Sequence, residues 1–329
     1  MSKLFEELDY RPTPIGALSL RRRRELSLGV DVFEIKLGDE YLMSSLFTAS
    51  EIALARLGLA ALEGVNLEVI VGGLGLGYTA QAVLEHEAVG SLIVVEMLDA
   101  VIDWHQTGLL PLGPSLVADK RCRLVQGDFF AMARGEAGFD PDASERRFDA
   151  VLVDIDHSPD ALLDDRSISF YQPPSLRALS AHIKPGGVFG LWSNDKPDRA
   201  FTDRLSGIFA EAWAEPVTFH NPLQDRPFTQ TVYLARTQFA VADEGQDLPP
   251  PRCGDRLQCS LHSSYVSRDL RKKQLTLASP AGRMSSRCSF VPAEARSRYV
   301  SRARPPRGRP ARSRPHSRRA AGRSSARLS

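Results

Sequence analysis

The chain has 329 residues, 43% of them hydrophobic, and its net charge at pH 7 is only +2. This is enough apolar material for one large domain or two small ones. No run approaches the roughly 18 consecutive apolar residues that a membrane span needs, and the acidic start MSKLFEELDY is unlike a secretory leader. We therefore expect a globular, cytoplasmic protein that does not bind a membrane.

The small net charge conceals two parts of opposite charge. Residues 251–329 carry 20 Lys and Arg against 3 Asp and Glu, whereas residues 1–250 carry 22 against 37. The basic part is rich in Arg, Ser and Pro and lacks apolar periodicity, so we expect residues 239–329 to form a disordered tail. Such arginines could neutralise nucleic-acid phosphates. We favour the alternative, in which the tail has no selected role and nucleic acid is not a partner.

Residues 1–48 are expected to form a small N-terminal module of β-strands. Within residues 13–45 apolar and polar residues alternate, and Gly29 and Gly38 interrupt the alternation as turns would. Four consecutive arginines, Arg21–Arg24, fall inside the first of these strands. We interpret them as a solvated strand face that protects a sheet edge rather than as a nucleic-acid contact.

Residues 49–238 alternate strands and helices, which is typical of a parallel, doubly wound sheet. A helix is expected over residues 50–64, with Ser50 as its N-cap. The segment closes with a helix over 199–213 and then two strands with no helix between them, which predicts an antiparallel pair at the sheet edge. The five strands before that pair are expected at residues 67–73, 91–97, 122–128, 148–156 and 186–193.

Three alternate glycines, Gly73, Gly75 and Gly77, separate the first parallel strand from the next helix. Glycines at such a turn let a ligand approach backbone amides closely. Glu96 ends the next strand, 19 residues beyond Gly77, where a carboxylate can accept hydrogen bonds from both ribose hydroxyls of an adenosine compound. These four residues predict a binding site for either a nicotinamide cofactor or an S-adenosyl compound.

Asp128 follows the third strand, in the sequence QGDFF. A carboxylate there can hold the amino group of adenine, which favours an S-adenosylmethionine site over a dinucleotide site. The closing strand pair points the same way, because it marks the sheet of class I methyltransferases. An alternative is that Asp128 only caps the following helix. The predicted fold is α/β: a doubly wound, seven-stranded, class I methyltransferase-like sheet, preceded by the β module and followed by the basic tail.

The strand in FDAVLVDID delivers Asp154 and Asp156 to its carboxyl end, where open α/β sheets place their chemistry. His157 and Asp160 follow directly. Carboxylates beside an adenosyl pocket can bind a cationic amine and accept its proton, so this cluster favours a small amine as the second substrate. The alternative is an acidic loop exposed to water.

Over residues 13–236 the sequence resembles the spermidine synthase family, the polyamine aminopropyltransferases. The resemblance lies in the segments VIVGGLGLG, VVEMLDAVID, VQGDFF, FDAVLVDID and HIKPGGVFGLWS. It implies transfer of an aminopropyl group from decarboxylated S-adenosylmethionine to putrescine or a related amine, without a metal, in a protein that is commonly a homodimer. It also implies that Asp154 helps to deprotonate the amine and that Asp156 contacts a cationic group.

The sequence departs from the family pattern chiefly where the amine is handled. Leu74 and Leu76 stand between glycines where family members carry GGGDGG. Met43 lies near the place of a hairpin glutamine, and the family's Tyr-His-Glu is missing from SEIALARLGL. The acceptor is therefore expected to differ from putrescine. Three alternatives stay open: a class I methyltransferase that uses S-adenosylmethionine, a non-catalytic adenosyl-binding homologue, and a nicotinamide dehydrogenase.

Four further residues are candidates for the acceptor pocket. Asp195 could hold a distal ammonium, Trp192 and Tyr171 could form walls, and His157 could act as a base. For the two aromatic residues we favour the alternative of core packing. The four cysteines show no zinc-type spacing and are expected to be unpaired thiols.

Overall fold

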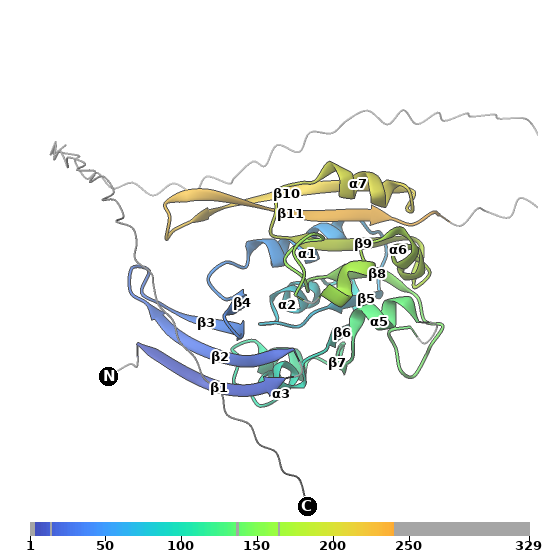
Figure 1. The fold of residues 1–329 in the computed structure, drawn as a ribbon. Helices are drawn as coiled ribbons and strands as arrows, with labels where there is room; N and C mark the ends of the chain where they lie inside the picture. The colour runs from blue at the N-terminus through green and yellow to red at the C-terminus, as the bar shows by residue number, and fades with distance from the viewer. Residues whose placement is uncertain (1–3, 14, 136–137, 164, 240–329) are drawn as a thin grey trace, which may run out of the picture. The chain divides into compact units, whose positions relative to one another are not determined.

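A computed structural model of the chain describes residues 4–13, 15–135, 138–163 and 165–239 (Figure 1). The predicted tail lies outside the described residues except for Phe239, and so do three of the four cysteines. The fourth, Cys122, is a free thiol. Within the described ranges, no helix combines the length and the apolar character that crossing a membrane requires.

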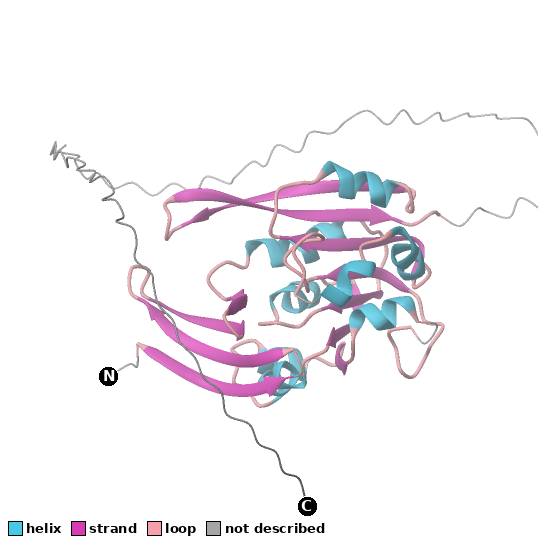
Figure 2. Cartoon of the chain, in the orientation of Figure 1, coloured by secondary structure: helices cyan, strands magenta, loops and turns pink. Residues whose placement is uncertain are grey.

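The N-terminal module is an antiparallel sheet of four strands that follow one another in chain order (Figure 2). The edge strand β1 was not predicted, because none of its residues is fully buried and its sequence FEELDYRPT therefore shows no clear apolar face. The strands are β1 (Phe5–Thr13), β2 (Gly16–Glu25), β3 (Val30–Leu37) and β4 (Glu40–Ser44).

The arginine run Arg21–Arg24 lies on β2 and is paired with acidic residues of this same sheet. Arg22 contacts Glu6 of β1 at 2.6 Å, and Arg23 contacts Glu34 of β3 at 2.7 Å. The other two arginines also contact carboxylates of β1 and β3. The run is half-buried rather than fully solvated, and its charge is balanced within the module.

The large sheet has seven strands in the order β10-β11-β9-β8-β5-β6-β7. The five strands from β9 to β7 are parallel, and β11 runs antiparallel to both β9 and β10. The predicted doubly wound sheet and its closing antiparallel pair are thus confirmed. The strands are β5 (Leu67–Gly72), β6 (Val89–Glu96), β7 (Cys122–Gln126), β8 (Phe148–Val153), β9 (Ile183–Ser193), β10 (Glu211–Asn221) and β11 (Arg226–Arg236).

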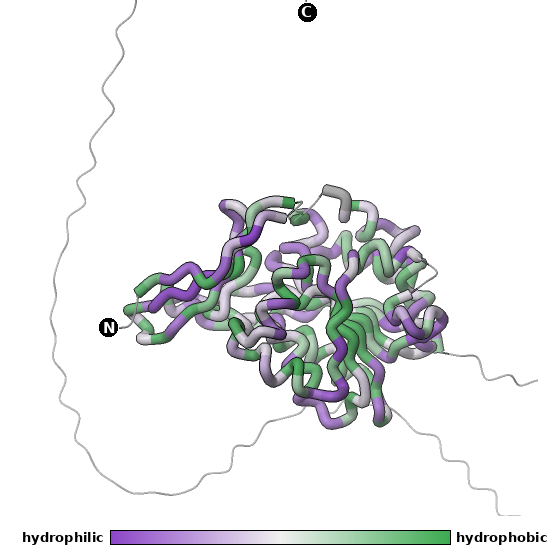
Figure 3. Tube along the Cα trace, turned by 90° about the horizontal axis from the view of Figure 1, so that it is seen from below, coloured by the Kyte–Doolittle hydropathy of each residue, from purple (hydrophilic) through white to green (hydrophobic). Residues whose placement is uncertain are grey.

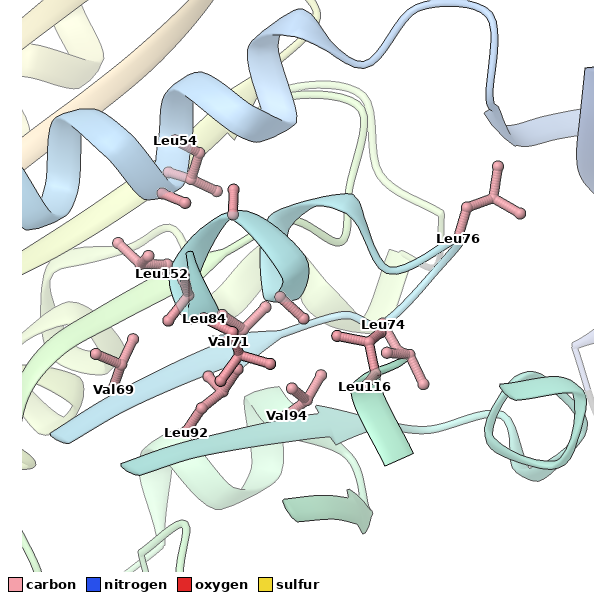
Figure 4. Close-up of a cluster of buried hydrophobic side chains, with 14 of the residues drawn as sticks. Leu54, Val69, Val71, Leu74, Leu76, Leu84, Leu92, Val94, Leu116 and Leu152 are labelled. Carbon is pink, nitrogen blue, oxygen red and sulfur yellow. The ribbon is translucent and has the colours of Figure 1, made fainter. Parts of the chain in front are cut away.

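Helices cover both faces of the large sheet. Val69 and Val71 of β5 belong to the same buried cluster as Leu54 of α1 (Figure 4), whereas Ile70 belongs to a second cluster with Leu176 of α6. Because both faces are covered, the central strands are apolar almost throughout (Figure 3). The helices are α1 (Ala49–Ala60), α2 (Tyr78–Leu84), α3 (Asp99–Gln106), α4 (Gly113–Ala118), α5 (Phe129–Arg134), α6 (Pro173–Ser180) and α7 (Arg199–Ser206).

Three helix boundaries differ from the sequence-based expectation, and one of them is the end of α1, which lies at Ala60 rather than at residue 64. The N-cap of α1 is Thr48 rather than Ser50, which lies inside the helix with a fully buried side chain. Helix α7 ends at Ser206, with Gly207 as its C-cap, and residues 211–213 begin β10 instead of continuing the helix. Pairing with β11 along its whole length decides the structure of this segment.

Candidate active site

A cavity of about 300 Å³ lies at the carboxyl ends of β5, β6 and β8 and is bordered by the N-terminal module. The module contributes an apolar wall, whereas the strand ends contribute acidic side chains and the glycine loop. Glu96, Asp128 and Asp154, which come from three different strand ends, therefore meet in one cavity. The residues of the apolar wall are Ile15, Ile35, Leu37, Leu42 and Met43.

The glycine loop forms the cavity wall through Gly73 and Gly75, whose φ angles are +90° and +47°. A Cβ on Gly73 would lie 2.2 Å from the main-chain oxygen of Asp154, so no larger residue fits there. Gly77 is not among the described lining residues. It is the N-cap of α2, with a φ of +91°, and a Cβ there would meet the ring of His105 at 2.9 Å. Its contribution is to the turn rather than to the wall.

The two leucines between the glycines anchor the loop in the apolar core. Leu74 and Leu76 are both almost fully buried and belong to the cluster that contains Leu116 of α4 (Figure 4). The main-chain N–H of Leu76 donates a hydrogen bond to Met43 Sδ at 3.1 Å. The glycine loop is therefore fastened to β4 of the N-terminal module through Met43.

Glu96 lies at the end of β6, within reach of the glycine loop. The main-chain N–H of Leu74 donates to Glu96 Oε2 at 3.0 Å, and that of Leu98 donates to Oε1 at 2.8 Å. Burial raises the pKa of Glu96, and these backbone hydrogen bonds act in the opposite direction. The main-chain N–H groups of Gly75 and Met97 also act on this carboxylate. A carboxylate has about four acceptor positions, so ribose hydroxyls that bind Glu96 would share its oxygens with these main-chain donors.

Asp128 is the N-cap of α5, as the alternative interpretation expected. Its Oδ1 accepts hydrogen bonds from the main-chain N–H groups of Phe130 at 2.9 Å and Ala131 at 3.1 Å. Asp128 also lines the cavity, next to Phe129 and Phe130. Since both capping bonds use one oxygen, capping the helix and contacting a ligand are compatible roles.

Asp154 and Glu51 form an acidic pair on the cavity wall. Thr79 of α2 donates a hydrogen bond to Asp154 Oδ2 at 2.6 Å. Burial raises the pKa of Asp154 to about 6, and burial together with the charge of Asp154 raises the pKa of Glu51 to about 7. Near neutral pH the pair therefore combines one carboxylate that can take up a proton with a second group that retains one.

Asp156 lies on the same wall, and its carboxylate holds the loop that follows β8. Tyr171 Oη donates a hydrogen bond to Asp156 Oδ2 at 2.7 Å, and the main-chain N–H of Leu163 donates to Oδ1 at 2.9 Å. Burial raises the pKa of the Tyr171 phenol well above its usual value. Asp156 thus lines the cavity, as predicted for this strand end, but both of its carboxylate oxygens already accept hydrogen bonds within the protein.

The accessory candidates divide into two groups. The described lining of the cavity includes Trp192 and His157 but neither Tyr171 nor Asp195. His157 Nε2 lies 3.1 Å from Glu40 Oε1 of β4, so this residue links the loop after β8 to the N-terminal module. Tyr171 packs in the core, which is the alternative that we favoured for it.

The electrostatic character of the cavity is strongly acidic. Its described lining holds five carboxyl groups against one guanidinium, that of Arg134. Such a wall attracts cations and repels anions. Among the residues that the structure describes, no group of three or more His, Cys, Asp or Glu could hold a metal ion. The five carboxyl groups belong to Glu51, Glu96, Asp128, Asp154 and Asp156.

Glu51 and Thr79 were not identified from the sequence. Glu51 lies in SEIALARLGL, a segment without the Tyr-His-Glu motif of the family. The available signal was an acidic residue among apolar ones in a helix that precedes the glycine loop. Thr79 lies two residues beyond the last glycine, in the first turn of α2, and only its contact with Asp154 reveals its part in the site.

No protein-family model matches the chain. Two solved structures are similar to it over 71% of its length. One is a spermidine synthase in complex with the transition state analogue AdoDATO, with a TM-score of 0.55, 17% identity and 74% of that chain covered. The other is spermidine synthase from Thermotoga maritima, with a TM-score of 0.52, 16% identity and 73% covered. The chain has the spermidine synthase fold.

Curated relatives of this spermidine synthase-fold chain include putrescine N-methyltransferases 3 and 1 of Nicotiana tabacum. Each is 26% identical over 136 residues, which is 41% of this chain and 32% of the relative. The matched region therefore spans about a third of the length of these relatives. The predicted resemblance is confirmed at the level of the fold.

Proposed function

We propose that this protein is a transferase that moves the aminopropyl group of decarboxylated S-adenosylmethionine to an amine. The observation that carries the proposal is that Glu96, Asp128 and the Glu51–Asp154 pair line one cavity beside the glycine loop. The names of the relatives, spermidine synthase and putrescine N-methyltransferase, support a transferase whose acceptor is a small amine.

The donor side of the cavity would hold the adenosine. Glu96 would accept the two ribose hydroxyls, and Asp128 would accept the amino group of adenine. Phe129 and Phe130 offer apolar surface beside Asp128 for the base. Gly73 and Gly75 line the cavity and would let the sugar and sulfur approach the main chain, because glycine has no side chain to stand in between.

The acceptor side would prepare the amine for attack. The donor is a sulfonium, so its carbon beside the sulfur is already electrophilic, and the protein must chiefly align an unprotonated nitrogen with it. The nitrogen forms the new C–N bond while the C–S bond breaks, and methylthioadenosine leaves with the electron pair of that bond. Asp154 would accept the proton of the amine, and a pKa of about 6 leaves this base ionised at neutral pH.

The charge of the cavity favours the decarboxylated donor. S-adenosylmethionine carries a carboxylate that its decarboxylated form lacks. The ionised carboxyl groups of the wall disfavour such an anion, and the single guanidinium of Arg134 is the one arginine in the described lining that could attract it. The second candidate is N-methyl transfer from S-adenosylmethionine to a diamine. The observation in its favour is the name of the curated relatives.

The test is to incubate the full chain with each donor and a panel of monoamines and diamines, and to identify the products by mass spectrometry. Aminopropyl transfer yields methylthioadenosine, whereas methyl transfer yields adenosylhomocysteine. We expect methylthioadenosine. Asp154→Asn should lower the rate by about 10²- to 10⁴-fold, which is the usual contribution of a general base.

Asp195→Asn is the matched control, because Asp195 follows the neighbouring strand β9 but is not part of the described cavity lining. It should change the rate less than about 2-fold, as surface substitutions commonly do. Adenosylhomocysteine together with a methylated amine would establish the second candidate instead. Binding of methylthioadenosine without turnover of any amine would identify a non-catalytic homologue.

A further inference from the structure

A short chain of hydrogen bonds runs from the acidic pair to the protein surface. Ser50 Oγ lies 2.7 Å from Glu51 Oε2 and also 2.7 Å from Gln230 Oε1 of β11. Gln230 Nε2 in turn donates to Asn194 Oδ1 at 2.9 Å. Ser50 and Gln230 are buried, whereas Asn194 is exposed. None of these three residues belongs to the described cavity lining, so they do not act on a substrate directly.

The hydrogen bonds that join Glu51, Ser50 and Gln230 share a limited number of protons. A serine hydroxyl has one proton to donate. In the structure Gln230 turns its carbonyl oxygen toward Ser50, and its amide nitrogen donates to Asn194 Oδ1. A carbonyl oxygen can only accept, so the Ser50 proton is committed to that bond. Ser50 Oγ and Glu51 Oε2 lie 2.7 Å apart in a buried place, and two oxygens at that distance need a proton between them. Because the Ser50 proton is committed to Gln230, we assign the proton of this second bond to the Glu51 carboxyl.

We infer that Ser50 and Gln230 hold Glu51 in its protonated form, so that Asp154 alone carries the negative charge of the acidic pair. Both are positioning residues that act through Glu51. The inference concerns the proton count of the protein itself, and only its catalytic consequence rests on the proposed function.

Burial and the charge of Asp154 both favour a neutral Glu51 carboxyl, and they outweigh the hydrogen bonds from the main-chain N–H groups of Ser50 and Glu51, which favour its ionised form. The titratable groups that act on it or feel it are Asp154, beyond β8, and Tyr78, on α2. Asp154 is a like charge, and its repulsion disfavours a second carboxylate. The partners from α1, β11 and the segment after β9, namely Ser50, Gln230 and Asn194, carry no charge. His157 and Asp156 complete the ionisable groups on this part of the cavity wall.

A protonated Glu51 has a consequence for the proposed reaction. Two carboxylates beside an ammonium would stabilise its charged form and raise the pKa of the amine, which would then keep the proton that blocks attack. With Glu51 neutral, one carboxylate binds the amine and also takes its proton. The uncharged neighbour thus makes Asp154 a more effective base.

The test is a direct titration of Glu51 in the full chain, by infrared spectroscopy of protein labelled with ¹³C-glutamate, with Glu51→Gln to assign the signal. In Gln230→Leu the Ser50 proton becomes free to bond the Glu51 carboxylate. The titration midpoint of Glu51 should then fall by about one pH unit, the usual worth of one charge-assisted hydrogen bond. In Ser50→Ala the midpoint should also fall, because protonated Glu51 loses its acceptor.

The opposite arrangement of protons predicts different results. If Ser50 donated to an ionised Glu51, Ser50→Ala would raise the midpoint, and Gln230→Leu would leave it at the wild-type value. Either result overturns the inference. Gln224→Leu, in the exposed β10–β11 turn, is the matched control and should leave the midpoint unchanged. The two test substitutions lie on different elements, α1 and β11, so each provides a test if the other does not fold.

The titration also separates this inference from the proposed function. If no amine is turned over but the midpoint shifts as expected, the proton assignment stands and the proposed reaction fails. If the protein is active, Gln230→Leu should lower kcat more than it changes KM for the amine, and the alkaline limb of the pH profile of kcat/KM should move down with the Glu51 midpoint. An active protein whose Glu51 midpoint does not move overturns only the inference.

Discussion

Thr79 donates a 2.6 Å hydrogen bond to Asp154, and this bond joins the first turn of α2 to the carboxyl end of β8. Since α2 begins directly after the glycine loop, the bond couples the candidate base to the loop that would hold the donor. It also favours the ionised form of Asp154 and so limits the rise that burial causes in its pKa.

Replacing Thr79 by Val should therefore raise the pKa of Asp154 above its value of about 6. A hydrogen bond to a charged group contributes about 1.5 kcal/mol or more, which corresponds to roughly one pH unit. The acid limb of the pH–rate profile should shift upward by that amount. Thr79→Ser keeps the hydroxyl and should retain the wild-type profile. An unshifted limb in Thr79→Val would show that the bond does not tune the base.

Glu51 should destabilise the folded protein as the pH rises. Its folded pKa is about 7, above its ordinary value of 4.5, so between these values the folded state binds more protons than the unfolded state and stability falls with increasing pH. Glu51→Gln should thus raise the free energy of unfolding at pH 8 by on the order of 1–3 kcal/mol, and by much less at pH 5. Urea unfolding at both pH values measures this difference.

Glu85→Gln serves as the control for this comparison. Glu85 is exposed on the surface and contacts only the exposed Arg56 at 3.5 Å among the ion pairs of the described residues. Its substitution should leave the free energy of unfolding within about 0.5 kcal/mol at either pH, as is usual for surface positions. Equal effects of the two substitutions would contradict the pH dependence that we assign to Glu51.

A comparison of Gly73 with Gly38 separates two costs of adding a side chain to the glycine loop, namely the steric clash of the new Cβ and the strain of a positive φ angle. Both have positive φ angles, but a Cβ on Gly73 would meet the Asp154 main chain at 2.2 Å, whereas a Cβ on Gly38 would meet nothing within 4 Å. Gly38→Ala should cost about 1–2 kcal/mol from backbone strain alone. Gly73→Ala should cost clearly more, about 3 kcal/mol or above, when both are measured by thermal unfolding.

The two roles of Asp128 can be separated by replacement with Ser. Serine is a good N-cap, so the stability of Asp128→Ser should stay within about 0.5 kcal/mol of wild type. Its shorter side chain cannot reach an adenine, and loss of one charge-assisted hydrogen bond should weaken methylthioadenosine binding about 10-fold or more. Calorimetry measures both quantities.

Asp198→Ser is the matched control for that experiment. Asp198 caps α7 by accepting hydrogen bonds from the N–H groups of Ala200 and Phe201, at the same two positions of the helix as for Asp128 but with one bond to each oxygen, and it is not among the described residues of the cavity wall. Its substitution should affect stability as little as that of Asp128 and should not change binding. Equal affinity in both variants would limit Asp128 to capping.

The sequence alone determined the fold and the donor half of the candidate site. The period of apolar residues predicted the parallel strands, and the two final strands predicted the antiparallel edge. Glu96, Asp128 and Asp154 could be placed together because the carboxyl ends of neighbouring parallel strands meet at one edge of a sheet. The strand positions follow from the local pattern of apolar residues, and the meeting of strand ends follows from the topology of parallel sheets, so both can be predicted from the sequence.

Only the tertiary structure decided the acceptor half. Ser50 and Gln230 are 180 residues apart, and neither looks like part of a site until α1 packs against β11. Glu51 is an ordinary acidic residue in the sequence, yet packing makes it a buried acid with a raised pKa. Asp156 was predicted at the strand end, but only packing shows that its carboxylate anchors the loop after β8. The charge state of a carboxyl depends on how much water and which partners remain around it after folding, and this depends on the whole packed structure rather than on neighbouring residues.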